Sequence, residues 1–389
     1  MKSSESKKSE SLEFKAMNDY RNALQDANQI QDLGISFQEE SKPVTRLEHF
    51  QSRVVALVTL FHPTADCVKN VVRFAEQCDF VICCDNSDED NGEVFKDIPK
   101  CQYIANRRNL GLSVAFNAVL SSKVFDWREE DFVIFFDQDA CINSGHIQKL
   151  VGIYLALTRS GLSIGALGPC VFNRCANRMS MPRVRYPVDE NTFYVDALIT
   201  SSMLTTFGKL KSVGFWNEDI FLDYADFDLC FRMRALGLPS LMTRAVLLNH
   251  ASGSGEKSCF GLRVIDENPL RAFYQVRDVL RLVAAPETPK RIRLLLGFVR
   301  KCLLQLLLLN KRSERFRYMF RGLVDYLQKG KGAYVLEPRI ELQSEGLEKA
   351  IKLDGEGRNA LKDKENNSLG GAKLTCSNDC ADATFEEVA

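Results

Sequence analysis

Two aspartates one residue apart, Asp137 and Asp139, close an apolar run of strand character, Asp-Phe-Val-Ile-Phe-Phe-Asp-Gln-Asp. Because strand side chains point the same way every second residue, both carboxylates leave the strand end together, with Gln138 between them. Such a pair is repulsive unless a cation neutralises it, and Mg²⁺ commonly binds through one or two carboxylates plus substrate phosphates. The spacing therefore indicates a metal–diphosphate site. A solvated pair of loop carboxylates is the alternative that this motif alone leaves open.

Two further polar segments follow apolar runs of strand length. Thr59 and Phe61 belong to a turn, Thr-Leu-Phe-His-Pro, that could receive a flat base, although a simple strand–helix loop closed by Pro63 is the alternative. Asp85 begins the segment Asp-Asn-Ser-Asp. Its carboxylate could accept hydrogen bonds from a nucleobase or ribose, but Asp-Asn-Ser is also common turn chemistry. Taken alone, the second segment would be assigned as a turn.

Residues 106–117, Asn-Arg-Arg-Asn-Leu-Gly-Leu-Ser-Val-Ala-Phe-Asn, join a glycine to a helix start. Gly111 would let the backbone approach a ligand where helix amides favour anions. One of the two arginines before it could meet a diphosphate, and Asn117 lies on the same helix, eight residues after Asn109. A glycine-containing loop followed by an ordinary helix is the alternative.

The densest candidate segment, residues 214–232, is acidic. On a helix, Asp223 and Asp226 would be neighbours at i,i+3, and Asp228 would reach Arg232 at i,i+4. The second spacing predicts a structural ion pair at the helix end. Asp226 has no comparably placed cation, which would leave it able to act as a base. A solvated acidic helix start, favoured by the helix dipole, is the alternative.

These motifs need a sheet that brings strand ends together. Apolar runs predict strands at 54–60, 80–84, 101–104 and 132–136, and the stretches between them predict helices at 65–77 and 112–121. The alternation predicts an α/β doubly wound sheet, whose ligands lie beyond the carboxyl ends of the strands. Asp85, Asp137 and Asp139 all fall at such ends. His250 follows a later strand-like run and could complete a metal site, although a simple loop histidine is the alternative.

Composition limits the classes of protein. Lys+Arg and Asp+Glu balance at 51 each, so no global charge points to nucleic acid. The polar start predicts no secretory signal. Thirteen scattered cysteines without a Cys-x-x-Cys pair favour buried, reduced thiols in a cytosolic protein.

Four segments are predicted along the chain: a polar N-terminal extension (1–50), a catalytic domain (51–285), a basic, leucine-rich helical extension (286–335) and a disordered tail (336–389). The leucine run of the third segment is too short and too flanked by charge to span a bilayer. Its basic residues suit a membrane surface or an interdomain helix. An ordinary core helix with a solvated basic face is equally compatible.

The order of these motifs resembles that of the GT-A glycosyltransferases of family 2, specifically their rhamnosyltransferase-like branch. The shared order is a Thr…Pro turn, an Asp-Asn-Ser loop, an Asn-x-Gly helix start, Asp-x-Asp, an acidic Phe-x-Asp-Tyr-x-Asp segment and a late His. The resemblance covers about residues 53–332 and implies a GT-A fold, a doubly wound mixed or parallel sheet flanked by helices with a C-terminal helical extension. Segments 195–202 and 268–278 also resemble family segments. Ala225-Asp226 replaces the Glu-Asp of many relatives, and Phe61-His62 replaces the usual Tyr-Asn or Phe-Asn.

The resemblance implies a role for each candidate residue. Asp226 would be the general base of an inverting displacement, and Asp137, Asp139 and His250 would hold Mg²⁺ or Mn²⁺, with Asp139 favoured as the direct ligand. The donor-binding residues it implies are Thr59, Phe61, Asp85, Asn109, Gly111, Asn117, Asp137, Gln138 and Arg232. The donor would be a nucleotide-sugar, with dTDP-L-rhamnose favoured, and the acceptor a glycan or lipid-linked saccharide. The expected location is the cytoplasm, with peripheral contact at the inner face of a membrane and no nucleic-acid partner.

Two other functions stay open from the sequence. Nucleotidyl transfer on a similar fold would want a Gly-rich, Lys-bearing loop after the first strand, and residues 59–66 contain none. A catalytically degenerate GT-A domain could serve as a nucleotide-sugar-binding or scaffold protein. The presence of all the candidate carboxylates argues against such decay.

Overall fold

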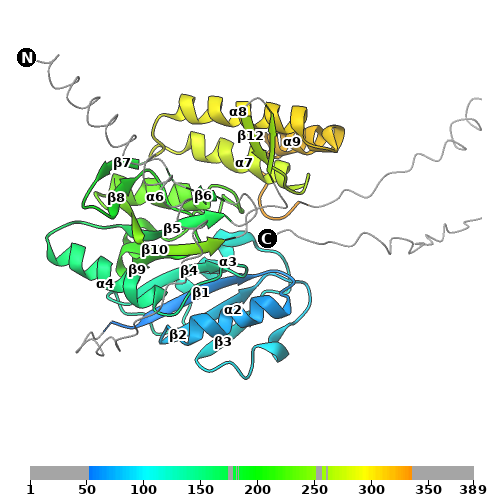
Figure 1. Cartoon of the computed structure of the whole chain (residues 1–389). Coiled ribbons are helices and arrows are strands. Elements are labelled where there is room, and N and C mark those ends of the chain that lie inside the picture. Colours follow the sequence, from blue (N-terminus) through cyan, green and yellow to red (C-terminus); the bar gives the residue numbers. More distant parts are fainter. Residues whose placement is uncertain are drawn as a thin grey trace, which may run out of the picture. The chain divides into compact units, whose positions relative to one another are not determined.

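The fold is taken from a computed structural model, which describes residues 52–173, 178–180, 182, 184–250, 256–259 and 262–334 (Figure 1). The predicted N-terminal extension and the predicted disordered tail lie outside the described residues. The rest forms a mixed β-sheet with helices on both faces and three helices after it. This arrangement confirms the fold class expected from the sequence.

The first half of the sheet is parallel and follows the predicted strand–helix alternation. Its strands are β1 (Val54–Leu60), β2 (Phe80–Asp85), β3 (Cys101–Ala105) and β4 (Phe132–Asp137), in the spatial order β3-β2-β1-β4. The connections contain α2 (Ala65–Ala75), the short 3₁₀ helix η1 (Gly92–Val94) and α3 (Gly111–Leu120). In register, Thr59 pairs with Asp137 and Leu60 with Asp85, so the ends of three strands meet at one edge.

The second half of the sheet mixes strand directions. Beyond β4 the order continues β9-β5-β10-β8-β7, with β6 beside β5; β4 pairs antiparallel with β9, and β5 parallel with β10. The strands are β5 (Ala166–Asn173), β6 (Arg178–Ser180), β7 (Val184–Pro187), β8 (Thr192–Val195), β9 (Met203–Thr206) and β10 (Ser240–His250). The helices among them are α4 (His146–Arg159), α5 (Phe207–Val213) and α6 (Ala225–Ala235).

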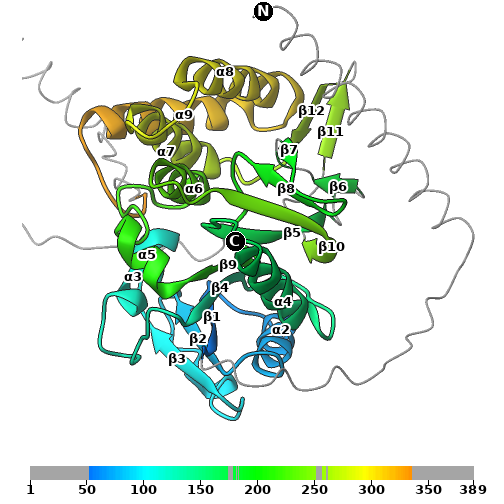
Figure 2. The same cartoon turned by 90° about the vertical axis from the view of Figure 1, so that its left-hand side faces the viewer.

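Both faces of the central strands are covered, which explains their unbroken apolar runs. Val55 and Leu57 of β1 belong to a core with α3, α5 and α6, whereas Ala56 and Val58 belong to a second core with α2 and α4. All four side chains have no exposed surface. Figure 2 shows α2 and α4 on one side of the strands and α3 and α5 on the other.

A helical layer follows the sheet. It consists of α7 (Arg271–Ala284), α8 (Arg291–Leu308) and α9 (Arg312–Leu327), preceded by the hairpin of β11 (Glu256–Cys259) and β12 (Leu262–Ile265). In both views α7 lies between α6 and the outer helices α8 and α9 (Figures 1 and 2). Arg277 of α7 is buried and donates to Asp325 of α9 (3.2 Å) and to the Gly332 carbonyl (2.8 Å). Among the described residues, no helix combines the length and apolar composition needed to cross a membrane.

Among the nine cysteines whose side chains the structure describes, no disulfide joins two of them. Six are buried, and Cys101, Cys141 and Cys302 are partly exposed. Burial raises the pKa of Cys230 and of Cys302 to about 11. These thiols are therefore protonated at neutral pH and serve as small apolar side chains.

Candidate active site

The carboxyl ends of β1, β2 and β4 bring the predicted polar segments to one edge of the sheet. β4 ends at Asp137, one residue beyond the predicted end of this strand. Asp137 and Asp139 are partly exposed, whereas Gln138 between them is buried with 9% of its surface exposed. The two carboxylates therefore leave the strand end toward solvent, and the amide turns inward.

Gln138 fastens the turn after β1 to the end of β4. Its Oε1 accepts a hydrogen bond from the Phe61 N–H (2.9 Å), and its Nε2 donates to the Phe61 carbonyl (3.0 Å). This pair of bonds imitates one rung of a β-ladder beyond the end of the sheet. The Gln138 carbonyl in turn accepts from Asn70 Nδ2 of α2 (3.0 Å). Gln138 thus fixes the position of Phe61 relative to Asp137 and Asp139.

Ser201, which precedes β9, holds Asp137 through two hydrogen bonds. The Ser201 hydroxyl accepts from the Asp137 N–H (3.0 Å) and donates to Asp137 Oδ2 (2.9 Å). The next residue, Ser202, has φ 66° and lies 2.7 Å from Nε2 of His146 through its hydroxyl. Burial lowers the pKa of His146 to about 4, so this imidazole is neutral at physiological pH. Sequence reasoning did not single out Ser201, although it lies in the segment 195–202 that resembles the family.

Asp85 is fully buried and organises the loop after β2. Its Oδ1 accepts from the N–H (2.9 Å) and hydroxyl (2.5 Å) of Ser87, and its Oδ2 accepts from Asn91 Nδ2 (2.8 Å) and the Tyr103 hydroxyl (2.7 Å). The Ser87 hydroxyl also accepts from the His62 N–H (2.7 Å). A direct bond between Asp85 and a nucleoside would require one of these bonds to be exchanged.

The predicted glycine-containing loop contacts the acidic segment. Gly111 has φ +78°, and a Cβ added there would collide with the carbonyl oxygen of Phe221. The next N–H, that of Leu112, donates to the same carbonyl (2.8 Å). The Asn109 side chain accepts from the Gly111 N–H (3.0 Å). The need for glycine here is thus explained by the approach of Phe221.

Asn117 lies further along α3 and is buried. Its Nδ2 donates to the Trp216 carbonyl (2.9 Å) and to Glu218 (3.0 Å), and its Oδ1 accepts from the Trp216 N–H (3.0 Å). Asn117 therefore fixes the chain entering the acidic segment. The structure does not bring its side chain to the carboxyl edge of β1 and β4.

In the acidic segment, α6 begins at Ala225, because Tyr224 takes a left-handed conformation with φ 68°. The expectation that Asp223 shares a helix with Asp226 was therefore wrong. Asp223 instead pairs with Arg271 of α7 (3.1 Å), a cation that sequence reasoning missed although it lies in the segment 268–278. The predicted Asp228–Arg232 ion pair is confirmed at 2.6 Å.

Asp226 differs from its two acidic neighbours because, within the described part of the chain, no Lys or Arg forms an ion pair with it. It is partly buried, and its Oδ1 accepts from the Phe227 N–H (2.8 Å). Burial raises the pKa of Asp226 to about 7, and the charges of Asp137 and Asp223 act in the same direction. The carboxyl can therefore gain and lose a proton near neutral pH.

The last two predicted site residues are Arg232 and His250. Arg232, expected to bind the donor, is directed to Asp228 and to the Val213 carbonyl (2.8 Å). The side chain of His250 lies outside the described residues. Its backbone ends β10, and the preceding Asn249 carbonyl accepts from the N–H of Cys141 (3.2 Å). The end of β10 thus runs beside the loop that leaves Asp139.

Few side chains at this edge could bind a divalent cation. The described residues contain no group of three or more His, Cys, Asp or Glu side chains placed to hold a metal ion. Asp137 and Asp139 nevertheless supply two partly exposed carboxylates at a strand end. That number is what Mg²⁺ commonly takes from a protein when substrate phosphates and water complete its shell. The residues present therefore fit a metal that arrives with a diphosphate.

The motifs at this sheet edge are similar to those of family 2 glycosyltransferases. Residues 62–163 match the family model described as glycosyl transferase family 2. The chain is 24% identical over 299 residues to the dTDP-rhamnosyl transferase RfbF of Shigella flexneri, which covers 73% of this chain and 92% of that protein. The predicted resemblance to rhamnosyltransferase-like proteins of family 2 is thereby confirmed. The matches support glycosyl transfer as the class of reaction.

Two solved structures are partly similar to this chain. A crystal structure of GalNAc-T7 with UDP, GalNAc and Mn²⁺ has a TM-score of 0.44 and 9% identity, covering 80% of this chain and 67% of that one. A crystal structure of S. aureus TarS 1–349 has a TM-score of 0.45 and 14% identity, covering 71% and 80% respectively.

Proposed function

We propose that the chain is an inverting glycosyltransferase that moves a sugar from a nucleotide-sugar to a hydroxyl of a glycan or lipid-linked saccharide. The named activity of the relative RfbF favours dTDP-L-rhamnose as the donor. One observation carries the proposal. Of the three aspartates between 223 and 228, two are neutralised by arginines, and Asp226, near Asp137, is left as a titratable carboxyl.

Asp226 is the general base in this proposal. It takes the proton of the acceptor hydroxyl as that oxygen attacks the anomeric carbon. The bond between the anomeric carbon and the nucleoside diphosphate breaks on the opposite face, so the configuration inverts. A base works best when its pKa lies near the operating pH, and the pKa of about 7 meets that condition.

Asp137 and Asp139 are the proposed ligands of Mg²⁺ or Mn²⁺, with His250 as a further ligand. The bound ion would neutralise charge on the diphosphate leaving group. Ser201 orients Asp137 for this task, since its hydroxyl fixes both the backbone and one carboxylate oxygen of that residue. Arg271 balances the charge of Asp223 and limits the negative potential around Asp226.

The donor nucleoside is proposed to lie over the ends of β1 and β2. There Thr59 and Phe61 would contact it directly, and the buried Asp85 would hold the loop that faces it. Asn109 and Gly111 would shape the wall shared with the acidic segment. The proposed location is the cytoplasm, at the inner face of a membrane, where a lipid-linked acceptor would be available.

The first test is a thermal-shift panel of dTDP, UDP, GDP and CDP, each with and without Mn²⁺, because a ligand that binds only the folded state raises the melting temperature. A metal-dependent shift with dTDP supports the proposed donor. A preference for UDP or GDP keeps the transferase and changes the sugar. Absence of any shift contradicts donor binding.

Turnover separates an enzyme from a binding module. Nucleotide release from the preferred donor is measured for the wild type, Asp226→Asn and, as a surface control, Asp66→Asn on α2. Loss of turnover with retained nucleotide binding is expected for Asp226→Asn alone. Binding without turnover in the wild type would favour the degenerate scaffold, and full turnover in Asp226→Asn would remove Asp226 as the base.

A further inference from the structure

The outer side of α8 exposes a continuous apolar stripe. Ile292, Leu296, Val299, Leu303 and Leu307 recur at helical spacing and expose 76%, 64%, 45%, 55% and 64% of their surface. Steps of three and four residues place all of them on one face of the helix. An ordinary surface helix turns such a stripe toward the core, so the orientation here is reversed.

The outer side of α9 repeats the pattern. Phe316, Phe320, Leu323 and Leu327 expose 60%, 57%, 40% and 69% of their surface and again share one face. The residues that α8 and α9 bury are different ones, namely Phe298, Gln305, Arg315, Met319 and Gly322. We call the nine exposed residues of the two helices the α8–α9 face. The core-helix alternative left open by the sequence does not account for this exposure.

Cations flank the α8–α9 face. Residues 291–327 contain nine Lys or Arg and two Asp or Glu, although the whole chain is balanced. Arg293 and Arg300 of α8 and Arg312 and Arg317 of α9 are exposed. The segment is therefore positively charged, and exposed cations lie on the same two helices as the exposed apolar residues.

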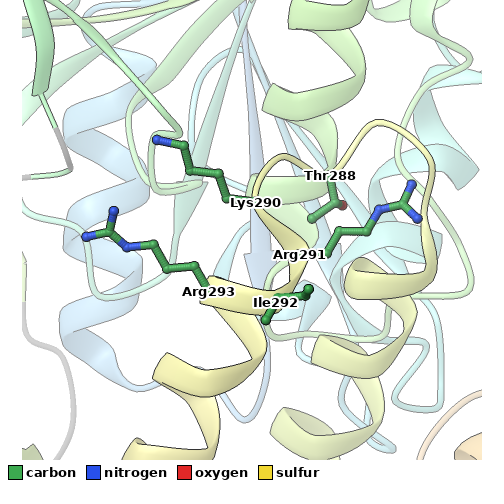
Figure 3. Close-up of a pocket in the computed structure, with 5 residues that line it drawn as sticks. All are labelled: Thr288, Lys290, Arg291, Ile292 and Arg293. Atoms are coloured by element: carbon green, nitrogen blue, oxygen red, sulfur yellow. The ribbon is translucent and has the colours of Figure 1, made fainter.

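At the start of α8, a shallow hollow of about 460 Å³ is lined by cations. Lys290, Arg291 and Arg293 surround it together with Thr288 and Ile292. Figure 3 shows Lys290 and Arg293 extending to one side of the helix start and Arg291 to the other. Ile292 of the apolar stripe thus lies among side chains that could meet phosphate groups.

We propose that the α8–α9 face docks on an anionic phospholipid surface. An amphipathic helix with an apolar face and flanking Lys and Arg lies in the plane of the membrane interface, and anionic headgroups attract the cations. Exposed apolar stripes on two neighbouring helices exceed the scattered apolar residues of an ordinary protein surface. The positive flanks are the feature that selects a lipid surface over a second copy of the chain, whose identical face would carry the same charge.

This docking places a membrane beside the acidic segment. Phe298, on the buried side of α8, contacts the ring of Tyr224, with ring centroids 6.2 Å apart. Tyr224 lies two residues before Asp226. Because a helix with its side chains is about 10 Å across and the two rings are 6.2 Å apart, the lipid surface would lie on the order of 20 Å from the proposed base. That consequence rests on the proposed function and suits an acceptor sugar attached to a lipid.

The test is co-sedimentation of the full chain with vesicles of phosphatidylcholine alone or of equimolar phosphatidylcholine and phosphatidylglycerol, at low and high salt. The apolar variant is Leu296→Gln with Leu303→Gln. Its control is Leu236→Gln at the end of α6, since Leu236 and Leu303 are equally exposed at 55%. The charge variant is Arg293→Gln with Arg300→Gln, and its control is Lys123→Gln.

We expect salt-sensitive binding to the anionic vesicles only. Each removed cation should weaken partitioning about fivefold, and each removed leucine about tenfold, while both controls bind as the wild type does. Equal binding to neutral vesicles, no binding by the wild type, or unchanged binding by the double variants would overturn the proposal. So would a dimer, seen by sedimentation velocity without lipid, that Leu296→Gln with Leu303→Gln dissolves.

Release of nucleotide from a soluble donor is measured in parallel. It should not change in these variants, because none of the substituted residues belongs to the proposed site. Lost lipid binding with retained donor turnover would therefore separate the docking surface from the proposed reaction.

Discussion

Replacement of Asp226 by Asn should stabilise the fold while it abolishes turnover. The substitution keeps the shape of the side chain and removes the charge. In the wild type, burial raises the pKa of Asp226 from 3.8 to about 7, so the folded state holds this proton more tightly than the unfolded state does. Stability is therefore lost as the pH rises from about 4 to about 7, and the loss is complete above the folded pKa.

The size of the effect follows from the shift. About three pKa units at 1.36 kcal/mol each give an upper limit of roughly 4 kcal/mol. Because the side chain is partly exposed, solvent screens part of this penalty, and we expect about 1–2 kcal/mol. Asp226→Asn should therefore match the wild type near pH 4 and exceed its free energy of unfolding by that amount near pH 8.

The assay is guanidinium unfolding across this pH range, followed by tryptophan fluorescence. Asp228→Asn is the matched control, with the same substitution on the same helix. Asp228 is 1% exposed and paired with Arg232, so the control leaves a largely buried cation without its partner and should lose roughly 3 kcal/mol. Opposite signs at two positions two residues apart would not arise from a general effect of the substitution.

Destabilisation by Asp226→Asn near pH 8, or a gain that does not vary with pH, would refute the reasoning about Asp226. Kinetics give an independent check. If the ionised carboxylate is the base, kcat/KM should rise with pH through about 7.

Three further predictions concern residues that shape the site. Gln138→Leu should cost about 1–3 kcal/mol in urea unfolding and weaken donor binding, because the N–H and carbonyl of Phe61 lose their partners; unchanged affinity would contradict its positioning role. Gly111→Ala should cost several times the roughly 1 kcal/mol of Gly145→Ala, since both glycines have positive φ but only the first would meet a backbone carbonyl; equal losses would contradict this contact. The folded pKa of His146, about 4, lies below its ordinary 6.5, so the wild type should lose up to roughly 3 kcal/mol as the pH falls between these values; a difference between wild type and His146→Gln that is flat with pH would oppose this.

The parallel half of the fold was predictable because its strands are covered on both faces. Val54–Leu60 and Phe132–Asp137 are unbroken apolar runs that end at polar residues, and the structure has strands there with nearly the predicted bounds. The antiparallel strand Met203–Thr206 was not predicted. It has only four residues, and its partner in β4 lies about seventy residues earlier in the chain.

The residues of the candidate site also fall into those that the sequence could predict and those that it could not. Asp137, Asp139 and the Asp228–Arg232 pair could be identified because their spacing is local. The contacts of Ser201 and Arg271 join segments far apart in the sequence, which no periodic pattern encodes. The position of Asp223 was predicted wrongly because α6 begins only after Tyr224. Tyr224 takes a left-handed conformation, which no glycine at this position indicates in the sequence.

The free thiols give the molecule native reporters of local opening. Cys84 lies in β2, Cys230 in α6 and Cys302 in α8. The sheet, the helix α6 and the helical layer of α7, α8 and α9 therefore each contain at least one thiol. The buried thiols of Cys84 and Cys230 react with an alkylating mass tag only after their surroundings open, and the partly exposed Cys302, whose pKa is also raised, should react slowly in the folded state and faster once α8 detaches. The order in which tags accumulate at rising denaturant would reveal whether the α8–α9 helices detach before the sheet unfolds, without any substitution in the chain.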